Sequence, residues 1–336
     1  MSKKALFIAA ALVAALSVNS GARAAEKISI MVGGIEKIIY LPAKLAEQLG
    51  YFKEEGLDVE LLSEPAGVEA EDELLAGAVQ GVVGFYDHSI DLQAKGKLVA
   101  SVVQFSQAPG EVELVATKIA DQIRSPADFK GKNLGVTGLG SSTNFLTQYL
   151  AVKNGVALGQ FTSVPVGAGN TFIAAMQQGK IDAGMTTEPT ISRLLKTGEA
   201  KVLIDMRSPD STRAALGGVY PAACLYMQTS WVEQHHEETQ KLANALVKTL
   251  RYIASHSAED IASHMPRDYY VGDKALYIQA LATGKQMFTA DGVMPSDGPP
   301  TVLAVLSTFD KTVKGKTIDL SKTYTTSFVR AVQATN

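Results

Sequence analysis

The sequence predicts an α/β protein with two domains, in which parallel sheets carry helices on both faces. Three observations lead to this fold class. Short β-prone runs alternate with helix-forming segments from residue 27 to about residue 226. Beyond that point the segments are helical in character. Without a short N-terminal signal the chain keeps about 310 residues, which is more than one typical core.

The first 24 residues have the pattern of a cleavable secretory signal. Lys3 and Lys4 precede an apolar run over 5–18, and Ala22-Arg23-Ala24 is the small-x-small pattern that signal peptidase reads. The run is shorter than the about 20 apolar residues that cross a bilayer. We therefore expect cleavage after Ala24. Because no cysteine follows the run to carry a lipid, we expect a soluble protein of the periplasm.

The composition argues against nucleic acid as a partner and against an internal disulfide. Removing the signal takes away three basic residues and no acid, so the net charge moves from −3 to about −6. The basic residues are scattered and do not form a run interleaved with aromatics. Cys224 is the only cysteine. We expect no cofactor, and no metal, because the histidines lack partners at ligand spacing.

The segments up to residue 116 fit repeated strand–helix–strand units. Strands are predicted over 27–32, 56–62, 81–85, 98–105 and 112–116, and helices over 41–49, 69–77 and 88–95. Pro42 lies in the first turn of the first helix and Gly50 follows its end, which is the usual placement of these residues.

The alternation continues through a last predicted strand at 202–205, and the character of the chain changes beyond Tyr226. Ser125 and Pro126 indicate a helix start. Strands are predicted over 133–137, 181–185 and 202–205, the turns 138–143 and 167–171 each open a helix, and later helices are predicted over 231–255, 258–264, 274–287 and 301–313. The helical C-terminal part either forms a second, consecutive domain or packs back onto the first domain. Periodicity alone does not decide between these two arrangements.

Four segments resemble one family of exported proteins. They are Tyr40-Leu-Pro42, Leu49–Val59, Ala127–Thr137 and Met176–Ala183. In this order, behind a signal sequence, they are similar to the nitrate/sulfonate/taurine-type periplasmic substrate-binding proteins of ABC importers. The resemblance covers essentially the whole chain.

The resemblance implies a two-lobed periplasmic binding protein fold, type II-like, with a ligand cleft between the lobes. Lobe one is expected to combine residues 25–112 and 225–336, with the C-terminal helices packed on it, and lobe two to hold residues 113–224. The implied partners are a small organic solute and an ABC permease of the inner membrane. The implied protein is a monomeric receptor and not an enzyme.

The candidate ligand-binding residues lie in turns that follow the predicted strands. In open α/β sheets ligands bind beyond the carboxyl ends of the strands, where helix N-termini converge. We expect no catalytic residue and no metal ligand among these candidates. They are Gly34, Ile35, Tyr40, Glu64, Tyr86, Asp87, His88, Gly140, Ser141, Ser142, Thr143, Asn170, Thr171 and Glu188.

The turn 138–143 is the strongest candidate. Its glycines let backbone approach a ligand, and its hydroxyls and the N–H groups of the helix start favour a carboxylate, a sulfonate or a polar ring edge. The alternative is a plain turn in which Ser141 only caps the helix. Gly169-Asn170-Thr171 repeats the pattern more weakly. No Gly-Lys-Ser/Thr follows, so a phosphate-binding loop is not indicated.

Residues 85–88 form a second cluster. Phe85 alternates with Val83 and is expected in the core, whereas Tyr86 and His88 fit the cleft or the surface equally well. Asp87 either accepts a hydrogen bond from an amine or ring N–H, or caps the helix that starts at His88.

The acidic candidates restrict the ligand. A carboxylate such as Glu64, Asp87 or Glu188 would be costly to desolvate beside nitrate or sulfate. We therefore expect a larger organic ligand with a donor or cationic part, such as a heterocyclic amine, with a carboxylate or sulfonate at the Ser141 turn.

Two other functions stay open. Fungal pyrimidine-precursor synthases share the implied architecture, which makes an enzyme possible. Those enzymes are expected, from the same resemblance, to carry a cysteine-rich iron-binding segment. This chain has a single cysteine, Cys224, and therefore cannot form such a segment. A ligand-sensing partner of a chemoreceptor would use the same cleft and differ in its docking surface.

Overall fold

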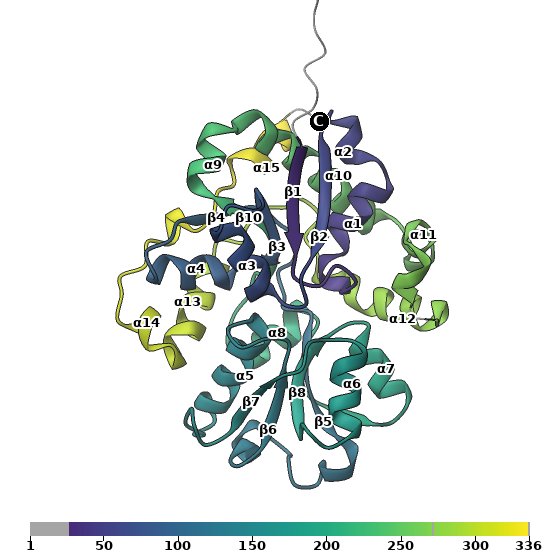
Figure 1. Ribbon diagram of the computed structural model, residues 1–336, viewed down its shortest axis with the longest axis vertical. Helices are drawn as coiled ribbons and strands as arrows, with labels where there is room; N and C mark the ends of the chain where they lie inside the picture. The colour runs from purple at the N-terminus through teal and green to yellow at the C-terminus, as the bar shows by residue number, and fades with distance from the viewer. Residues whose placement is uncertain (1–26, 271, 335–336) are drawn as a thin grey trace, which may run out of the picture.

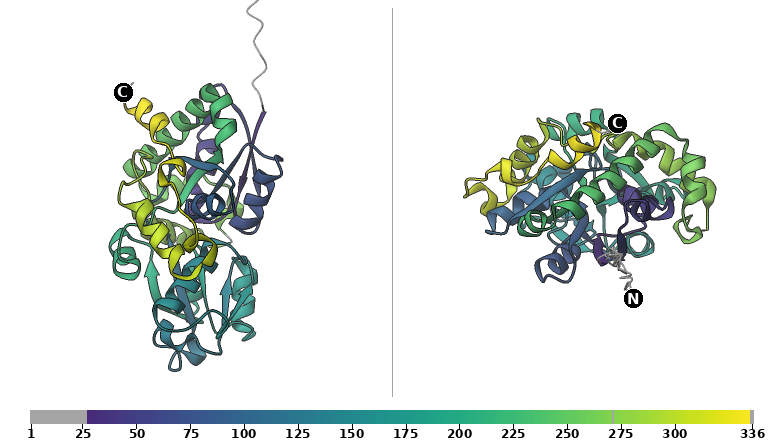
Figure 2. Two further views of the ribbon diagram at one scale, coloured as in Figure 1. Left: turned by 90° about the vertical axis from the view of Figure 1, so that its left-hand side faces the viewer. Right: turned by 90° about the horizontal axis from the view of Figure 1, so that it is seen from above.

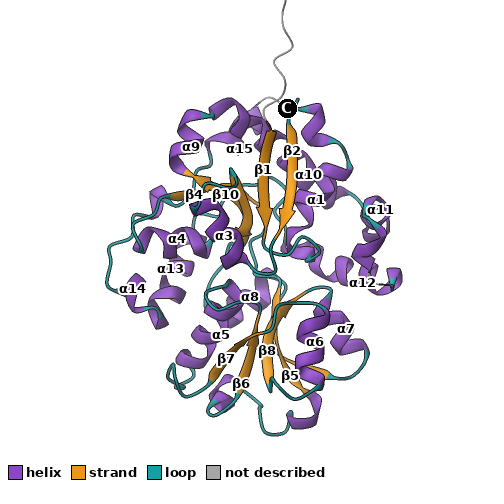
Figure 3. Ribbon diagram, in the orientation of Figure 1, coloured by secondary structure: helices purple, strands orange, loops and turns teal. Residues whose placement is uncertain are grey.

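Figure 1 shows the computed structural model, which describes residues 27–270 and 272–334. The chain forms two five-stranded sheets, one above the other in this view, with helices flanking both (Figure 3). The α/β class with two lobes is confirmed. The predicted signal peptide, residues 1–24, lies outside the described residues. Within the described ranges no helix is both long and apolar enough to cross a lipid bilayer.

The first sheet is the centre of lobe one and has the strand order β2-β1-β3-β10-β4. β1 pairs in parallel with β2 and β3, whereas β10 runs antiparallel between β3 and β4. Both β3 and β4 are buried along their whole length, which explains their largely apolar runs. The strands are β1 (Lys27–Val32), β2 (Asp58–Ser63), β3 (Gly81–Phe85), β4 (Val99–Gln104) and β10 (Ala223–Gln228).

The second sheet is the centre of lobe two and has the strand order β7-β6-β8-β5-β9. β6 pairs in parallel with β7 and β8, whereas β5 runs antiparallel between β8 and β9. Its strands are β5 (Glu111–Ala116), β6 (Asn133–Val136), β7 (Thr162–Pro165), β8 (Ala183–Thr187) and β9 (Ala200–Met206).

Each sheet is mixed, and the prediction of parallel sheets was wrong in this respect. The antiparallel strand is in each case the one by which the chain enters from the other sheet, since β5 follows residues 105–110 and β10 follows residues 217–222. A strand that begins at the junction between the sheets runs opposite to the strands that end there. The lobe boundaries at residues 112/113 and 224/225 stay predictions.

The two crossing segments are hydrogen-bonded to each other at the junction. The backbone N–H groups of Phe105 and Ser106 both donate to the carbonyl of Ala223, at 2.8 and 3.1 Å. The Ser106 hydroxyl in turn accepts from the N–H of Ala223 at 3.0 Å. The chain therefore crosses between the lobes in two segments that are hydrogen-bonded to each other where they meet the sheets.

Four helices belong to the first passage through lobe one and four to lobe two. The former are α1 (Leu41–Gln48), α2 (Tyr51–Glu54), α3 (Gly67–Leu75) and α4 (Asp87–Ala94). The latter are α5 (Ser142–Lys153), α6 (Asn170–Gln177), α7 (Thr190–Lys196) and α8 (Pro209–Leu216).

The C-terminal helices pack mainly on lobe one, as the green and yellow segments of Figure 2 show. α10 contacts β4, α1 and α15, whereas α12 and α13 also contact α7 and α5 of lobe two. The C-terminal part therefore covers lobe one and also touches its partner lobe. Its helices are α9 (Thr229–Gln234), α10 (His236–Ser255), α11 (Ala258–His264), α12 (Lys274–Gly284), α13 (Gly298–Phe309), α14 (Lys311–Lys314) and α15 (Ser327–Ala334).

Three predicted helices differ from the structure. The helix predicted over 301–313 is broken at Asp310, whose backbone (φ −85°, ψ 113°) is not helical, into α13 and α14. The helix predicted over 231–255 is broken at His235, whose backbone (φ −124°, ψ 52°) is not helical, into α9 and α10. The helix start at Ser125 leads only to a 3-10 turn, Pro126–Phe129, although Ser125 and Asp128 form a capping box. A cap indicates where a helix begins, but its length depends on the packing that follows.

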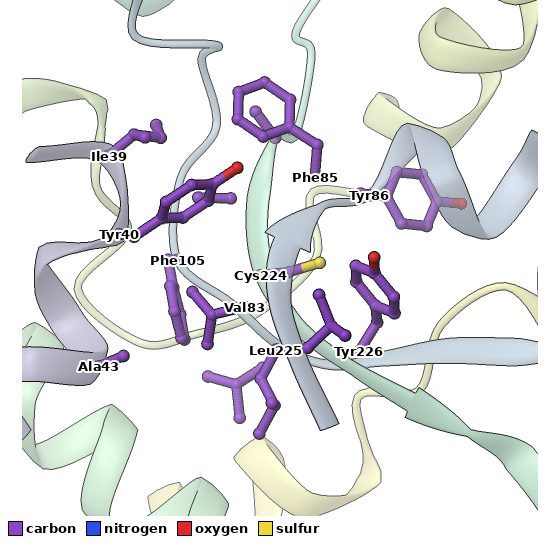
Figure 4. Packing of buried hydrophobic residues seen from close by; sticks show 14 of the residues in the cluster. Ile39, Tyr40, Ala43, Val83, Phe85, Tyr86, Phe105, Cys224, Leu225 and Tyr226 are labelled. Atoms are coloured by element: carbon purple, nitrogen blue, oxygen red, sulfur yellow. The ribbon is translucent and has the colours of Figure 1, made fainter. Parts of the chain in front are cut away.

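The largest apolar cluster of the described residues is centred on lobe one and continues across the junction. Tyr40 and Phe85 meet edge to face, with ring centroids 6.2 Å apart, close to the buried Cys224 (Figure 4). The same cluster includes Phe145 and Met185 of lobe two. The lobes are therefore joined by packed side chains as well as by the crossing segments.

β6 and β8 approach each other closely at two glycines, Gly135 and Gly184, which are paired in register. A Cβ added at Gly184 would lie 2.6 Å from the carbonyl oxygen of Gly135. We expect Gly184→Ala to lower the free energy of unfolding by about 1–3 kcal/mol, since the clash is with backbone. Urea denaturation measures this. Val202→Ala, at an exposed position of β9, should cost less than about 0.5 kcal/mol; equal losses in the two variants would contradict the account.

Candidate functional site

A small cavity lies between the lobes, where strands of both sheets end. It leaves about 10 Å³ for solvent, which is room for roughly one water molecule. Its position beyond the strand ends agrees with the place expected for a ligand. The lining residues are Lys37, Tyr40, Gly67, Phe85 and His88 from lobe one, and Glu111, Thr137, Ser141, Ser142, Thr143 and Thr187 from lobe two.

Lys37 connects the turns that follow β1 and β2 through hydrogen bonds to both. Its amine donates to the carbonyl oxygens of Gly33 at 2.6 Å and Pro65 at 2.9 Å. Burial lowers the pKa of Lys37 to about 8, although nearby carboxylates oppose this. The turns are in close contact, because a Cβ added at Gly33 would lie 2.8 Å from the Cα of Gly67. Together they form a compact base for the lobe-one side of the cavity.

Asp87, the first residue of α4, joins the two lobes. Its Oδ1 accepts a hydrogen bond from the hydroxyl of Ser142, the first residue of α5, at 2.8 Å. Its Oδ2 accepts from the Tyr220 hydroxyl, in the second crossing segment, at 2.8 Å. Burial raises the pKa of Asp87, and the neighbouring His88 and the two hydroxyl donors oppose the rise. A carboxyl that is fully buried depends on both donors.

His88 is buried between the lobes and paired with Glu71 of α3. Its Nδ1 hydrogen-bonds a Glu71 carboxylate oxygen, and its ring stacks on Tyr226 with centroids 6.3 Å apart. Burial acts to lower the pKa of His88, but the Glu71 carboxylate outweighs it and the pKa is raised to about 9. The imidazole is therefore protonated at neutral pH. Gly67 leaves room for the ring, since an added Cβ would lie 3.2 Å from Nε2.

The turn after β6 contains three hydroxyls that bond to one another. The oxygens of Thr137, Ser141 and Thr143 lie 2.8–3.0 Å apart. The Ser141 hydroxyl also donates to the carbonyl of Gly138 at 2.7 Å, and it does not cap α5. A Cβ added at Gly138 would lie 3.1 Å from the Cβ of Ala66. The turn is thus held by its own hydroxyls and packs against lobe one.

β5 brings two buried glutamates to the junction. Glu111 lines the cavity, is 1% exposed and faces Thr187 in the β5–β8 register. Burial, and then the charge of Asp87, raise the pKa of Glu111 well above its usual range. Glu113 lies behind the cavity, where it accepts from the Thr147 hydroxyl at 3.0 Å. Burial raises the pKa of Glu113 to about 8.

The structure brings only some of the predicted residues to the cavity. Tyr40, His88, Ser141, Ser142 and Thr143 line it, and Asp87 is bonded to one of them. Four other candidates lie near the turns but not in the lining, and their contact with a ligand stays a prediction: Gly34, Ile35, Glu64 and Gly140.

The remaining candidates are bonded elsewhere. The Tyr86 hydroxyl pairs with that of Thr323, and Tyr86 is not part of the cavity lining. The Glu188 carboxylate accepts from Arg207 at 2.9 Å and from the backbone N–H of Ser192 at 2.9 Å. Asn170 and Thr171 are exposed, and the Asn170 side chain accepts from Arg193 at 2.7 Å. Ligand contact by these four also stays a prediction.

Sequence reasoning did not select Lys37, Phe85, Glu111, Thr137 or Thr187 as site residues. Phe85, which the sequence places in the core, is buried there and also lines the cavity. Thr137 and Thr187 are the last residues before turns that were selected, so their signal was present. Glu111 is the first residue of β5, immediately after the first crossing segment. An acidic residue in an otherwise apolar strand is the feature of the sequence that could have indicated a site residue here.

The described ranges contain no group of three His, Cys, Asp or Glu side chains arranged to hold a metal ion. Cys224 is buried in β10, and burial raises the pKa of its thiol.

A family model described as NMT1/THI5 like matches residues 40–260, well over half of the chain. The chain belongs to this family. A curated relative is the 4-amino-5-hydroxymethyl-2-methylpyrimidine phosphate synthase THI13 of Saccharomyces cerevisiae (strain ATCC 204508 / S288c). It is 27% identical over 239 residues, which cover 68% of this chain and 67% of the synthase.

Solved structures similar to this NMT1/THI5-like protein include periplasmic binding proteins. A protein of Bordetella bronchiseptica RB50 has a TM-score of 0.89 and 34% identity, over 92% of this chain and 97% of that one. The alkanesulfonate-binding protein SsuA of Xanthomonas axonopodis pv. citri, solved with MOPS, has a TM-score of 0.65 and 18% identity, over 84% and 90%. The periplasmic nitrate-binding protein NrtA of Synechocystis PCC 6803 has a TM-score of 0.71 and 12% identity, over 93% of this chain and 89% of that one. The resemblance and fold predicted from the sequence are confirmed.

The Tyr220 hydroxyl should be needed for the stability of the closed junction. Tyr220→Phe removes the donor to Asp87 Oδ2 and leaves a buried carboxyl partly unpaired, so we expect the free energy of unfolding to fall by about 1–3 kcal/mol. Tyr277→Phe is the matched control, because no described residue pairs with that buried hydroxyl. Urea denaturation compares the two; a loss no larger in Tyr220→Phe than in the control would contradict the role given to Asp87.

Glu113 should make stability fall as the pH rises. The pKa of Glu113 is raised to about 8, so from about pH 4.5 to 8 the folded protein keeps a proton that the unfolded chain has released. Within this window the wild type should lose up to about 1.4 kcal/mol per pH unit through this group. Glu113→Gln should flatten the curve, and Glu233→Gln, at an exposed position of α9, should leave it unchanged. Parallel curves for wild type and Glu113→Gln, from urea unfolding at several pH values, would contradict this.

Proposed function

We propose that this protein is an extracytoplasmic receptor that captures a small organic solute between its lobes and delivers it to an ABC permease of the inner membrane. It acts as a monomer, after export and cleavage behind Ala24. The observation that supports this most directly is Asp87, which holds lobe one against α5 of lobe two at the edge of a polar cavity.

The geometry supports a receptor that opens and closes. The cavity has room for roughly one water molecule, so an organic solute enters only when the lobes move apart. Two crossing segments, residues 105–110 and 217–222, connect the sheets and provide the hinge. Hinge-bending around a ligand of this kind is a common means of capture.

The lining supports an organic solute better than a small inorganic anion. It combines donors from the α5 start with the carboxyl group of Glu111, beside the buried Asp87. A small anion placed there would be desolvated beside Glu111 and Asp87. The two cations of the lining, Lys37 and His88, are already hydrogen-bonded to backbone carbonyls and to Glu71, so the cost is high. SsuA binds alkanesulfonates and NrtA binds nitrate, so the present chain is proposed to differ from NrtA in ligand charge.

A second candidate function is catalysis on a pyrimidine precursor, favoured by the name of the yeast relative. A sensor that presents its bound ligand to a chemoreceptor is a third use of the same cleft. An enzyme alters its ligand, whereas a receptor or sensor returns it unchanged. A receptor for import also requires a permease as partner, which a sensor does not.

Ligand screening tests the receptor function. Purified protein without residues 1–24 is heated with organic acids, sulfonates and heterocyclic amines, and a bound solute should raise the melting temperature. Mass spectrometry of the solute after incubation should find it unaltered. Chemical conversion of the solute would favour the enzyme, and stabilisation by none of the compounds would contradict the receptor.

Two threonines at helix starts in lobe two provide a matched pair for the binding site. Thr143 lines the cavity at the start of α5, whereas Thr171 is exposed at the start of α6. If the cavity is the binding site, Thr143→Val should weaken solute binding about 10-fold, since a hydrogen-bonding group at the ligand is lost. The predicted contact of Thr171 would then not be made, and Thr171→Val should leave binding unchanged. Calorimetric titration measures both. Weakening by Thr171→Val alone would place the site elsewhere.

A further inference from the structure

Three buried polar atoms at the cavity have no hydrogen-bond partner among the described residues. They are His88 Nε2, Glu111 Oε2 and Thr187 Oγ1, and all three residues belong to the cavity lining. Buried polar atoms in native proteins are nearly always paired, with protein, water or a ligand. Their convergence on one cavity indicates that these atoms are the ones a solute would meet.

The other charged groups of the cavity lining, and Asp87 beside it, already have at least one partner. The Lys37 amine donates to two backbone carbonyls, and protonated His88 is paired with Glu71. Both oxygens of Asp87 accept hydroxyl hydrogen bonds. Glu111 is different within the lining: its Oε2 has no partner in the described part of the chain, whereas His88, whose Nε2 is also unpaired, has its charge matched by Glu71.

Glu111 and Thr187 stand side by side on neighbouring strands. They are directly paired in the antiparallel β5–β8 register, so their side chains share one face of the sheet. A carboxylate accepts hydrogen bonds only, and a hydroxyl can accept or donate. The pair therefore offers acceptors to a donor on the solute.

We infer that Glu111 selects the charge of the solute, by accepting hydrogen bonds from a positively charged nitrogen (a primary amine, an amidine or a protonated ring nitrogen) with the Thr187 hydroxyl beside it. This inference rests on the proposed receptor function and adds the residue that sets its specificity. A buried carboxylate without a cation is costly, and a cationic solute supplies the missing charge. An anionic solute would supply no charge to pair with the Glu111 carboxylate and would add a negative charge beside buried Asp87.

The state of Glu111 in the solute-free protein agrees with this role. Burial and the charge of Asp87 raise the pKa of Glu111, against the influence of Lys37, which favours the protonated carboxyl while no cation is present. A cationic solute replaces that proton, and the charge of the closed cavity does not change.

Solutes matched in shape and different in charge test the inference. Benzamidinium, benzamide and benzoate share one shape, as do acetamidinium, acetamide and acetate, and these sets are added to a panel of primary amines and amino-heterocycles with their matched amides and acids. Melting shifts and calorimetric titrations are measured for the wild type, Glu111→Gln and Glu113→Gln. Glu113 is the control, because it is a buried glutamate on the same strand whose carboxyl faces Thr147 and not the cavity.

We expect cations to bind the wild type and the matched acids not to bind. Glu111→Gln should weaken cation binding about 10-fold or more, in line with the loss of a charged hydrogen bond, and Glu113→Gln should leave it within about 2-fold. The melting temperature of the solute-free Glu111→Gln protein shows that the variant is folded.

The measurements distinguish failure of the role given to Glu111 from failure of the receptor function. Binding of acids to the wild type, or equal cation binding by wild type and Glu111→Gln, overturns the role of Glu111 and leaves the receptor intact. Equal weakening by Glu111→Gln and Glu113→Gln also overturns it, because the effect would then come from β5 as a whole. Binding of no compound of any charge contradicts the receptor function itself, and the inference with it.

Discussion

Buried carboxyl groups at the junction between the lobes are the constraint on which the rest of the structure depends. Asp87 is paired on both oxygens only while α5 and the second crossing segment lie against lobe one. Separation of the lobes would return Asp87 to water and break its bond to Ser142. Closure therefore exchanges hydration of a charge for hydrogen bonds, a balance that is small in net terms. A solute that binds the closed form better than the open one shifts that balance.

The topology explains why so many polar groups meet at one place. β1, β3, β6 and β8 end at the junction, so their following turns gather there, and the antiparallel strands β5 and β10 begin there. Glu111 is the first residue of β5 and for this reason shares the cavity with the residues that follow the parallel strands. Helices α12 and α13 contact both lobes from the C-terminal side, which limits the directions in which the lobes can move.

The sequence predicted many of the strands and helices and the edge of the sheets where the site lies, but not β7, β10, the strand order or the strand direction. His88 and Ser141 follow central strands and reach the cavity, as expected. Glu64 and Asn170 follow β2 and β7, which are edge strands, so the turns after them begin at the rim. The alternation of charged and apolar residues along Glu111-Val112-Glu113 is typical of a strand with one face in solvent. In the fold, α5 and lobe one cover the face that carries the two glutamates, so both are buried. Strand order depends on contacts distant in sequence, which periodicity does not record.

The interaction between Asp87 and Ser142 across the lobes can be measured by a double-mutant cycle. Asp87→Asn, Ser142→Ala and the double variant are unfolded in urea at neutral pH, and the coupling energy is taken from the three changes in stability. A hydrogen bond to a buried charged group predicts a coupling of about 1.5–3 kcal/mol. Additive effects, within about 0.5 kcal/mol, would show that the lobes are not held together at Asp87 and would contradict the account.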